Sequence, residues 1–264
     1  RVLSYSAFRR FKHLVTRRAR REPLAYIVGH KEFYGLDFVV NRQVLIPRPE
    51  TELMVEEAID ECRMQNEECR NLRIVDIGTG SGCIIVSIVK QLNSTFSIKD
   101  SKFFAMDISA GALKVARQND QQHGVVDKIT FFRGNLLEPF RPVILSKTQW
   151  SEGSHTVRDG KRTARQGVGF LAGARNDKVG ELIITANLPY LPTSEWRQTQ
   201  PEVRQWEPRD ALDGGKDGLK YYNDLFRQIE FLISNFQFLI AILCEICPEQ
   251  TLPFKKLVRR YFPQ

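Results

Sequence analysis

The sequence lacks the features of a membrane, disulfide-rich or fibrous protein. Its longest apolar candidate, residues 236–246, falls short of the roughly 18 to 20 residues of a membrane helix, and we expect a buried strand there. Five cysteines, an odd number in 264 residues, do not predict a disulfide framework, so we expect a reducing, cytoplasmic setting and no membrane partner. With only 17 glycines and 12 prolines, the chain is neither collagen-like nor of low complexity.

Acidic residues are in the minority: 31 Asp and Glu stand against 39 Lys and Arg, a net charge of +8. This excess favours an acidic partner, such as nucleic acid or a ribonucleoprotein, without identifying one. Residues 1–21 contain no acid, and Phe8, Phe11, Leu14 and Val15 recur at helical spacing. The segment predicts an amphipathic helix that packs on the next element, a nucleic-acid-binding helix or an organellar transit peptide.

Metal-ligand patterns are also missing. The four histidines lie in separate elements, and Cys244 and Cys247 form a C-x-x-C without a second pair. We therefore predict no metal and no redox site. Glu50 and Glu52 are expected to begin a helix and support a neighbouring site, not to act as a general base.

Strands and helices alternate from residue 72 onward, which predicts an α/β, doubly wound parallel sheet. We expect strands at 72–77, 102–107, 128–132, 182–186 and 238–246, and helices at 83–92, 110–123, 219–233 and up to Tyr261. Upstream, residues 23–46 predict one or two β-hairpins, and 49–62 predict a helix. Residues 146–180 are rich in Gly, Arg, Lys and Ser, which predicts a flexible basic insertion.

Three alternating glycines follow the first of these strands. Gly78, Gly80 and Gly82 let the backbone turn tightly and approach a ligand. Dinucleotide enzymes use a similar turn, but Gly-x-Gly-x-Gly after the acid Asp76 suits S-adenosylmethionine, whose amine needs an acidic or carbonyl-rich neighbour. We predict that the whole loop binds this cofactor: Gly78, Thr79, Gly80, Ser81 and Gly82.

Two further cofactor contacts are expected at strand ends. Asp107 ends the second strand, where a carboxylate can accept hydrogen bonds from both ribose hydroxyls. The alternative is a helix cap, a role that Ser109 can also fill. After the third strand, the Asn135 amide is expected to meet the adenine edge and Leu136 to pack on the ring, although a turn-forming Asn is an alternative.

The segment Asn187-Leu-Pro-Tyr190 follows the fourth strand and predicts the chemistry. A planar NH₂ group is a poor nucleophile because its lone pair is delocalised. The Asn187 carboxamide oxygen and the Leu188 carbonyl can accept its two hydrogens, which orients the lone pair toward a sulfonium methyl. Pro189 stiffens the turn, and Tyr190 offers a ring for stacking. We expect Asn187 and Tyr190 to be catalytic, all four residues to bind substrate, and Asn187 also to contact the cofactor.

The chain resembles the HemK/PrmC-type protein-(glutamine-N5) methyltransferases that modify peptide chain release factors. The likeness covers nearly all of residues 14–261. The glycine loop and Asn187–Tyr190 are part of this resemblance. The other matching segments are Pro23-Leu-Ala-Tyr-Ile-Val-Gly29, Phe33-Tyr-Gly-Leu, Leu45-Ile-Pro-Arg-Pro-Glu-Thr-Glu52, Glu207-Pro-Arg-Asp-Ala-Leu and Gly214-Gly-Lys-Asp-Gly218.

This resemblance implies a Rossmann-like class I methyltransferase sheet with an N-terminal helix and β-hairpin extension. It implies S-adenosylmethionine as cofactor and the glutamine of a release-factor Gly-Gly-Gln loop as acceptor. Residues 1–48 would be the remnant of a substrate-recognition domain, and 49–264 the methyltransferase domain. We expect a monomer that binds no nucleic acid stably.

The chain departs from the family pattern in four ways. Leu188 replaces the usual Pro, and the 146–180 insertion is longer than the family's linker. Most of the N-terminal helical domain and the closing antiparallel strand pair are missing, so we expect a fragment.

An adenine N6 methyltransferase acting on ribosomal RNA or DNA is the alternative, favoured by Leu188 and the net charge. The segments Arg48–Glu52 and Glu207–Arg209 favour glutamine, because they are expected to narrow the slot for the acceptor. A third hypothesis is a non-catalytic adaptor protein, but the presence of Asn187 and Tyr190 argues against it.

Overall fold

A parallel sheet positions the site. The computed structural model describes residues 4–65, 72–95, 98, 101–140, 182–236 and 241–263. The five described strands of this sheet run in the order β5-β4-β3-β6-β7. They are β3 (Arg73–Ile77), β4 (Lys102–Asp107), β5 (Ile129–Arg133), β6 (Leu182–Ala186) and β7 (Ala241–Cys244). The doubly wound fold is thus confirmed, and the strand order reverses between β3 and β6.

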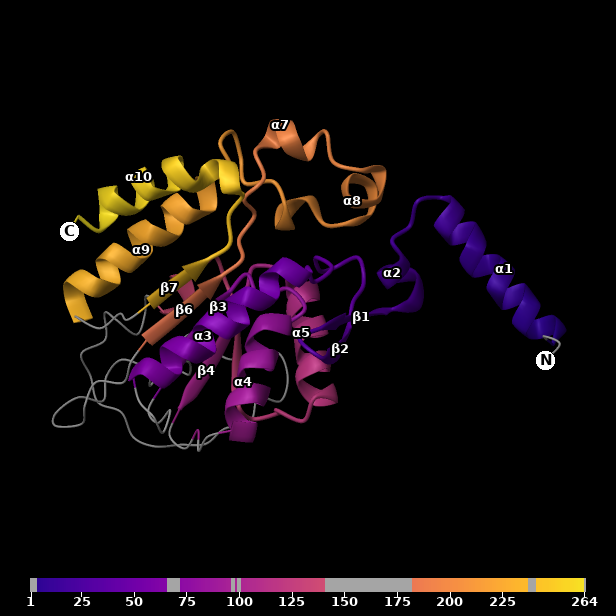
Figure 1. Cartoon of the computed structure of the whole chain (residues 1–264), viewed down its shortest axis with the longest axis horizontal. Coiled ribbons are helices and arrows are strands. Elements are labelled where there is room, and N and C mark those ends of the chain that lie inside the picture. Colours follow the sequence, from indigo (N-terminus) through magenta and orange to yellow (C-terminus); the bar gives the residue numbers. More distant parts are fainter. Residues whose placement is uncertain are drawn as a thin grey trace.

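Helices cover both faces of the sheet (Figure 1). On one face lie α3 (Glu52–Gln65), which follows the short η1 (Pro49–Thr51), α4 (Cys83–Thr95) and α5 (Ala110–Gln122). On the other lie α9 (Lys220–Phe236) and α10 (Thr251–Tyr261). Ile74 of β3 packs in the core beneath α3 and α4, whereas Val75 and Ile77 pack with Tyr222 of α9. A strand buried on both faces reads as a continuous apolar run, which is why these strands were predictable.

The hairpin prediction for residues 23–46 is correct only for β1 (His30–Phe33) and β2 (Leu36–Val39), which pair antiparallel. The preceding residues form a short helix, α2 (Leu24–Val28). Pro23 stands directly before it, where a missing N–H costs nothing. Gly29 ends it with a φ of +87°, a conformation that glycine adopts without strain.

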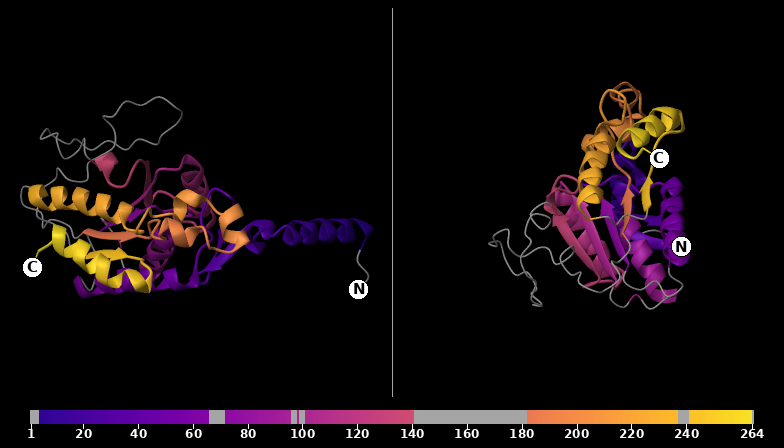
Figure 2. Two further views of the ribbon diagram at one scale, coloured as in Figure 1. Left: turned by 90° about the horizontal axis from the view of Figure 1, so that it is seen from above. Right: turned by 90° about the vertical axis from the view of Figure 1, so that its left-hand side faces the viewer.

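The basic N-terminal segment forms α1 (Tyr5–Ala19), which projects from the body of the molecule (Figure 2). Its C-terminal end is tied to α2, since Arg17 forms two hydrogen bonds with Glu22, at 2.8 and 2.6 Å, and one with the Tyr26 carbonyl. Phe8 and Phe11 remain more than half exposed. The predicted amphipathic helix is therefore present and is joined to α2 at its C-terminal end, but its apolar stripe does not pack on the described residues.

The proline-rich stretch after β6 contains two short helices, α7 (Thr193–Trp196) and α8 (Pro201–Trp206). Each begins at or directly after a proline, where the fixed φ suits a first helical turn. The observed β7 is shorter than the predicted 238–246 strand, part of which lies outside the described residues. The predicted insertion 146–180 also lies outside them. Among the described helices, none is long and apolar enough to cross a bilayer.

Candidate active site

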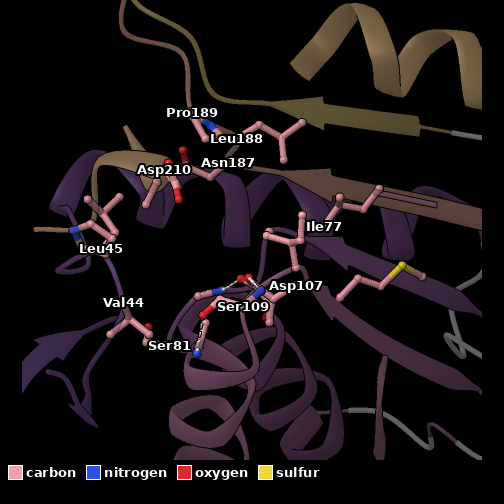
Figure 3. A pocket seen from close by; sticks show the side chains of 18 of the residues that line it. Val44, Leu45, Ile77, Ser81, Asp107, Ser109, Asn187, Leu188, Pro189 and Asp210 are labelled. Atoms are coloured by element: carbon pink, nitrogen blue, oxygen red, sulfur yellow. Dashed lines mark hydrogen bonds between the residues drawn. The ribbon is translucent and has the colours of Figure 1, made fainter. Parts of the chain in front are cut away.

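A cavity of about 450 Å³ opens where β3, β4 and β6 end (Figure 3). Its walls come from residues 42–48, the glycine loop, the end of β4, residues 134–136 after β5, residues 187–189 and residues 208–211. In parallel α/β sheets ligands bind at this kind of reversal in strand order. Of the predicted site residues, the cavity lining includes all except Gly82 and Tyr190.

The glycine loop needs glycine at each of its three positions, but for different reasons. Gly78, Gly80 and Gly82 have φ values of +72°, +56° and +79°, which L side chains rarely adopt. A Cβ at Gly82 would lie 3.1 Å from the Ala116 Cβ, so this glycine lets α5 approach the loop. A Cβ at Gly80 would meet no atom closer than 3.9 Å, because it would point into open space. Gly80 therefore leaves the adjoining part of the cavity open.

Asp76 supports the loop from below. Its carboxylate accepts hydrogen bonds from the hydroxyls of Thr79 at 2.6 Å and Thr185 at 2.8 Å, and the residue is fully buried. Burial raises the pKa of Asp76 to about 6. Asp76 does not line the cavity, so it joins the loop to β6 instead of serving as the acidic neighbour of an amine that the sequence pattern indicated.

Asp107 faces the cavity from the end of β4. Its two oxygens accept the backbone N–H groups of Gly80 at 3.0 Å and Ser109 at 2.8 Å. Ser109 caps α5 through its own hydroxyl, so the helix-cap role that was the alternative for Asp107 is filled by Ser109. Burial raises the pKa of Asp107. Each carboxylate oxygen still has a lone pair for a ligand hydroxyl.

Asn135 and Leu136 also line the cavity. The Asn135 amide donates to the Glu138 carboxylate at 3.1 Å, which anchors the turn. Leu136 is buried, and its φ of +52° is unusual for a residue with a side chain. The predicted role of Asn135 in the turn is therefore compatible with its predicted contact with the adenine edge of a ligand.

The amide of Asn187 is fixed by two partners. Its Nδ2 donates to the Thr51 hydroxyl at 3.2 Å and to the Glu245 carboxylate at 2.9 Å. A carboxylate only accepts, so the NH₂ group must be the end of the amide that faces Glu245. Both amide hydrogens are thereby used. No described residue donates to the carboxamide oxygen, which is left to accept from a ligand.

Tyr190 lies behind the cavity. Its hydroxyl donates to the other oxygen of Glu245 at 2.8 Å, and burial together with the Glu245 charge raises the pKa of Tyr190. The Tyr190 carbonyl accepts from Gln250 at 2.8 Å, which clamps the backbone of the turn. The sequence reasoning missed Glu245. The available signal was an acid directly after the last strand, inside the C-x-x-C pair that was set aside as a metal site.

An ion pair closes one wall of the cavity. Arg48 donates to the buried Glu207 at 2.6 Å, and the second Glu207 oxygen accepts the Ile46 N–H at 3.1 Å. The two segments expected to narrow the acceptor slot are thus in contact. Glu52 instead binds the Tyr34 N–H at 2.9 Å and supports the hairpin. Neither Glu50 nor Glu52 lines the cavity.

Within the described part of the chain, no group of three or more His, Cys, Asp or Glu could hold a metal ion. Burial raises the pKa of the Cys244 thiol to about 12, and it raises that of Cys247 as well. Both thiols are therefore weak nucleophiles near neutral pH.

Comparison with known proteins assigns the family. Residues 1–29 match the model of the PrmC N-terminal domain. Release factor glutamine methyltransferase of Geobacter sulfurreducens is 39% identical over 79% of this chain and 56% of its own length. The Bacillus subtilis protein of that name is 33% identical over 96% of this chain and 72% of its own. The chain belongs to the release factor glutamine methyltransferase family.

The family relationship comes with a difference in length. The chain spans 56% of the Geobacter sulfurreducens protein and 64% of the Thermodesulfovibrio yellowstonii protein. Among solved structures, the hMettl16 catalytic domain in complex with MAT2A 3'UTR hairpin 6 is 14% identical, with a TM-score of 0.54 over 86% of this chain and 67% of that chain. At this identity the likeness shows a shared class I methyltransferase fold and nothing about substrate.

Proposed function

We propose that the chain transfers a methyl group from S-adenosylmethionine to the side-chain amide nitrogen of a glutamine in a peptide chain release factor. The observation that carries the proposal is the Asn187 carboxamide, whose NH₂ group is held by Thr51 and Glu245 while its oxygen remains free beside the cavity. Membership of the release factor glutamine methyltransferase family supports glutamine as the acceptor.

The cavity suits the donor at three points. The open space over Gly80 leaves room for the ligand, and the residues of the Gly78–Gly82 loop would hold it. Asp107 can accept from ribose hydroxyls through its remaining lone pairs, and Leu136 offers an apolar surface to the adenine ring beside Asn135. Bound there, the donor supplies an electrophilic methyl group.

On the acceptor side, the Asn187 oxygen and the Leu188 carbonyl would accept the two hydrogens of the glutamine NH₂. This orients the nitrogen lone pair toward the methyl group. It also stabilises the positive charge that develops on the nitrogen as the N–C bond forms and the bond between the methyl carbon and the donor sulfur breaks. The nitrogen then loses one proton to solvent. Pro189 would hold the turn. Tyr190 does not line the cavity in this structure, so its ring would have to move toward the cavity on substrate binding to stack on the planar amide.

We assign residues 1–48 to substrate recognition and 49–264 to methyl transfer, with the 146–180 insertion between strands of the second part. The match of residues 1–29 to the PrmC N-terminal domain supports the first assignment. We further propose a monomer without stable nucleic-acid binding that works in the cytoplasm. The free cysteines Cys83, Cys244 and Cys247 are consistent with a reducing compartment.

The test is to incubate the purified chain with labelled donor and, separately, a release factor, a Gly-Gly-Gln peptide, ribosomal RNA and DNA. Mass spectrometry should find one added methyl group on the glutamine and no N6-methyladenine. Asn187→Ala should lower turnover by about 10²- to 10³-fold while leaving donor affinity nearly unchanged. Adenine methylation without glutamine methylation would overturn the assignment, and equal losses of affinity and turnover would make Asn187 a structural residue.

A further inference from the structure

One carboxylate behind the cavity receives hydrogen bonds from both residues of the predicted catalytic pair. Glu245 Oε2 accepts from Asn187 Nδ2 at 2.9 Å, and Oε1 accepts from the Tyr190 hydroxyl at 2.8 Å. Glu245 directly follows β7, whereas the other two residues follow β6, so the contact is made across the ends of adjacent strands. Glu245 does not line the cavity and acts only through its partners.

The backbone holds Glu245 in place. Its N–H donates to the Ala186 carbonyl at 3.3 Å, which continues the β6–β7 pairing by one residue. The buried Tyr222 hydroxyl lies between the carbonyls of Ala186 and Glu245 and also accepts the Leu188 N–H at 3.4 Å. The position of the carboxylate relative to Asn187 is therefore fixed by the sheet and by α9.

The charge of Glu245 decides which way the Asn187 amide points. The Thr51 hydroxyl can donate or accept, so it tolerates either orientation. Glu245 tolerates one, since a flipped amide would place its carbonyl oxygen against the carboxylate. A flipped amide would also present NH₂ to the acceptor's NH₂, where an acceptor of hydrogen bonds is needed.

A hydrogen bond to a carboxylate also polarises the amide. The carboxylate stabilises the resonance form of the amide in which the nitrogen is positive and the oxygen is negative. The negative charge on the Asn187 oxygen therefore increases, and its own hydrogen bonds become stronger, because hydrogen bonds in a chain strengthen one another. The acceptor nitrogen becomes more positive as its bond to the methyl carbon forms. A more negative Asn187 oxygen thus stabilises the transition state more than the ground state.

We propose that Glu245 is a positioning residue for methyl transfer: it orients and polarises the Asn187 amide and ties Tyr190 to the same point. This role rests on the proposed function. Because both partners share one carboxylate, a displacement of Glu245 moves both of them together.

Glu245→Gln is the informative variant, since glutamine has the same shape without the charge and no longer distinguishes the two amide orientations. We expect turnover to fall about tenfold to a hundredfold, less than removal of Asn187 itself, with donor affinity and acceptor KM changed by no more than about twofold. Glu249→Gln is the matched control, because Glu249 is an exposed acid in the adjacent η4 (Pro248–Gln250). It should keep full turnover. A Glu245→Gln enzyme with wild-type turnover would overturn the proposal.

A double-mutant cycle separates this role from general support of the fold. In an Asn187→Ala background, single-turnover rates should show little further loss on adding Glu245→Gln, because the amide that Glu245 orients and polarises is gone and only the contact with Tyr190 is left. A full, additive loss in that background would overturn the proposal. Tyr190→Phe, which keeps the ring, measures the share of the effect carried by the tyrosine.

A spectroscopic arm does not depend on the acceptor. In protein labelled with ¹⁵N-asparagine, the Asn187 NH₂ resonances, assigned with Asn187→Asp, should shift in Glu245→Gln and not in Glu249→Gln. Unshifted resonances would overturn the proposal for Glu245 whatever the enzyme methylates. A shift together with a wild-type enzyme that leaves glutamine unmodified would support the role of Glu245 and refute the proposed substrate.

Discussion

Replacing Asn119 with alanine should loosen the hairpin and the glycine loop together. Asn119 is fully buried in α5. Its carbonyl oxygen accepts the Val39 N–H at 2.7 Å, and its NH₂ group donates to the carbonyls of Val39 at 3.0 Å and Ser81 at 2.8 Å. Val39 ends β2 and Ser81 lies in the glycine loop, so one side chain joins the N-terminal block to the predicted cofactor site.

The size of the effect follows from these three hydrogen bonds. Each contributes about 1 kcal/mol net, so the free energy of unfolding should fall by about 3 kcal/mol. For a domain of this size that lowers the Tm by roughly 6 to 12 °C. Donor affinity should fall as well, because Ser81 loses the group that holds its peptide in place.

Urea unfolding measures the first effect, and calorimetric titration with S-adenosylmethionine measures the second. Gln122→Ala is the control, because Gln122 also reaches from α5 to the hairpin, where it donates to the Asp37 carbonyl, but it is exposed. We expect its loss to stay within about 0.5 kcal/mol. A loss below about 1 kcal/mol in Asn119→Ala, or equal losses in the two variants, would refute the claim that this buried amide joins the two parts.

Two further predictions concern the glycine loop. Gly80→Val should abolish donor binding in calorimetry with an unchanged circular dichroism spectrum. Gly124→Val, at a similar φ of +67° but away from the cavity, should still bind the donor. Equal donor affinities of the two variants would exclude the loop as the donor site. Asp76 binds a proton in the folded state up to pH about 6 but is ionised in the unfolded chain above pH about 4, so its contribution to stability falls as pH rises across that window. Relative to Asp76→Asn, the wild type should therefore lose about 2 kcal/mol between pH 4 and 6 in urea unfolding, and a difference independent of pH would contradict the raised pKa.

The parts of the fold that follow from local pattern were predictable. Apolar runs such as 182–186 mark strands buried on both faces, and the bounds of β6 agree with the prediction. The glycine loop could be placed because a tight strand-to-helix turn needs residues that accept positive φ. Asp107 and Asn187 could be placed because parallel strands bring their carboxyl ends to one edge of the sheet.

Contacts between distant segments were not predictable in the same way. Asn187 and Glu245 are 58 residues apart, and no periodicity connects them. Arg48 and Glu207 are 159 residues apart, and their pairing depends on how the stretch after β6 folds back. That stretch contains α7 and α8, which are too short for a helical apolar period to be recognised. The role of Asp76 was also misjudged, because its partner Thr185 belongs to a strand that follows it by 109 residues.

The central place of β3 has a consequence for biosynthesis. On its far side from β4, β3 pairs with β6, which is made about fifty residues after β5. At the usual speed of translation this leaves one edge of β3 open for roughly 3 to 10 s after the first three strands have emerged. The backbone N–H and C=O groups along this edge are then unpaired, and the apolar side chains of Ile74, Val75 and Ile77 flank them on both faces, the kind of surface that recruits chaperones or mispairs with other chains. The strand that carries the glycine loop is thus exposed to mispairing during synthesis, and slower synthesis between β5 and β6 should lower the yield of folded protein.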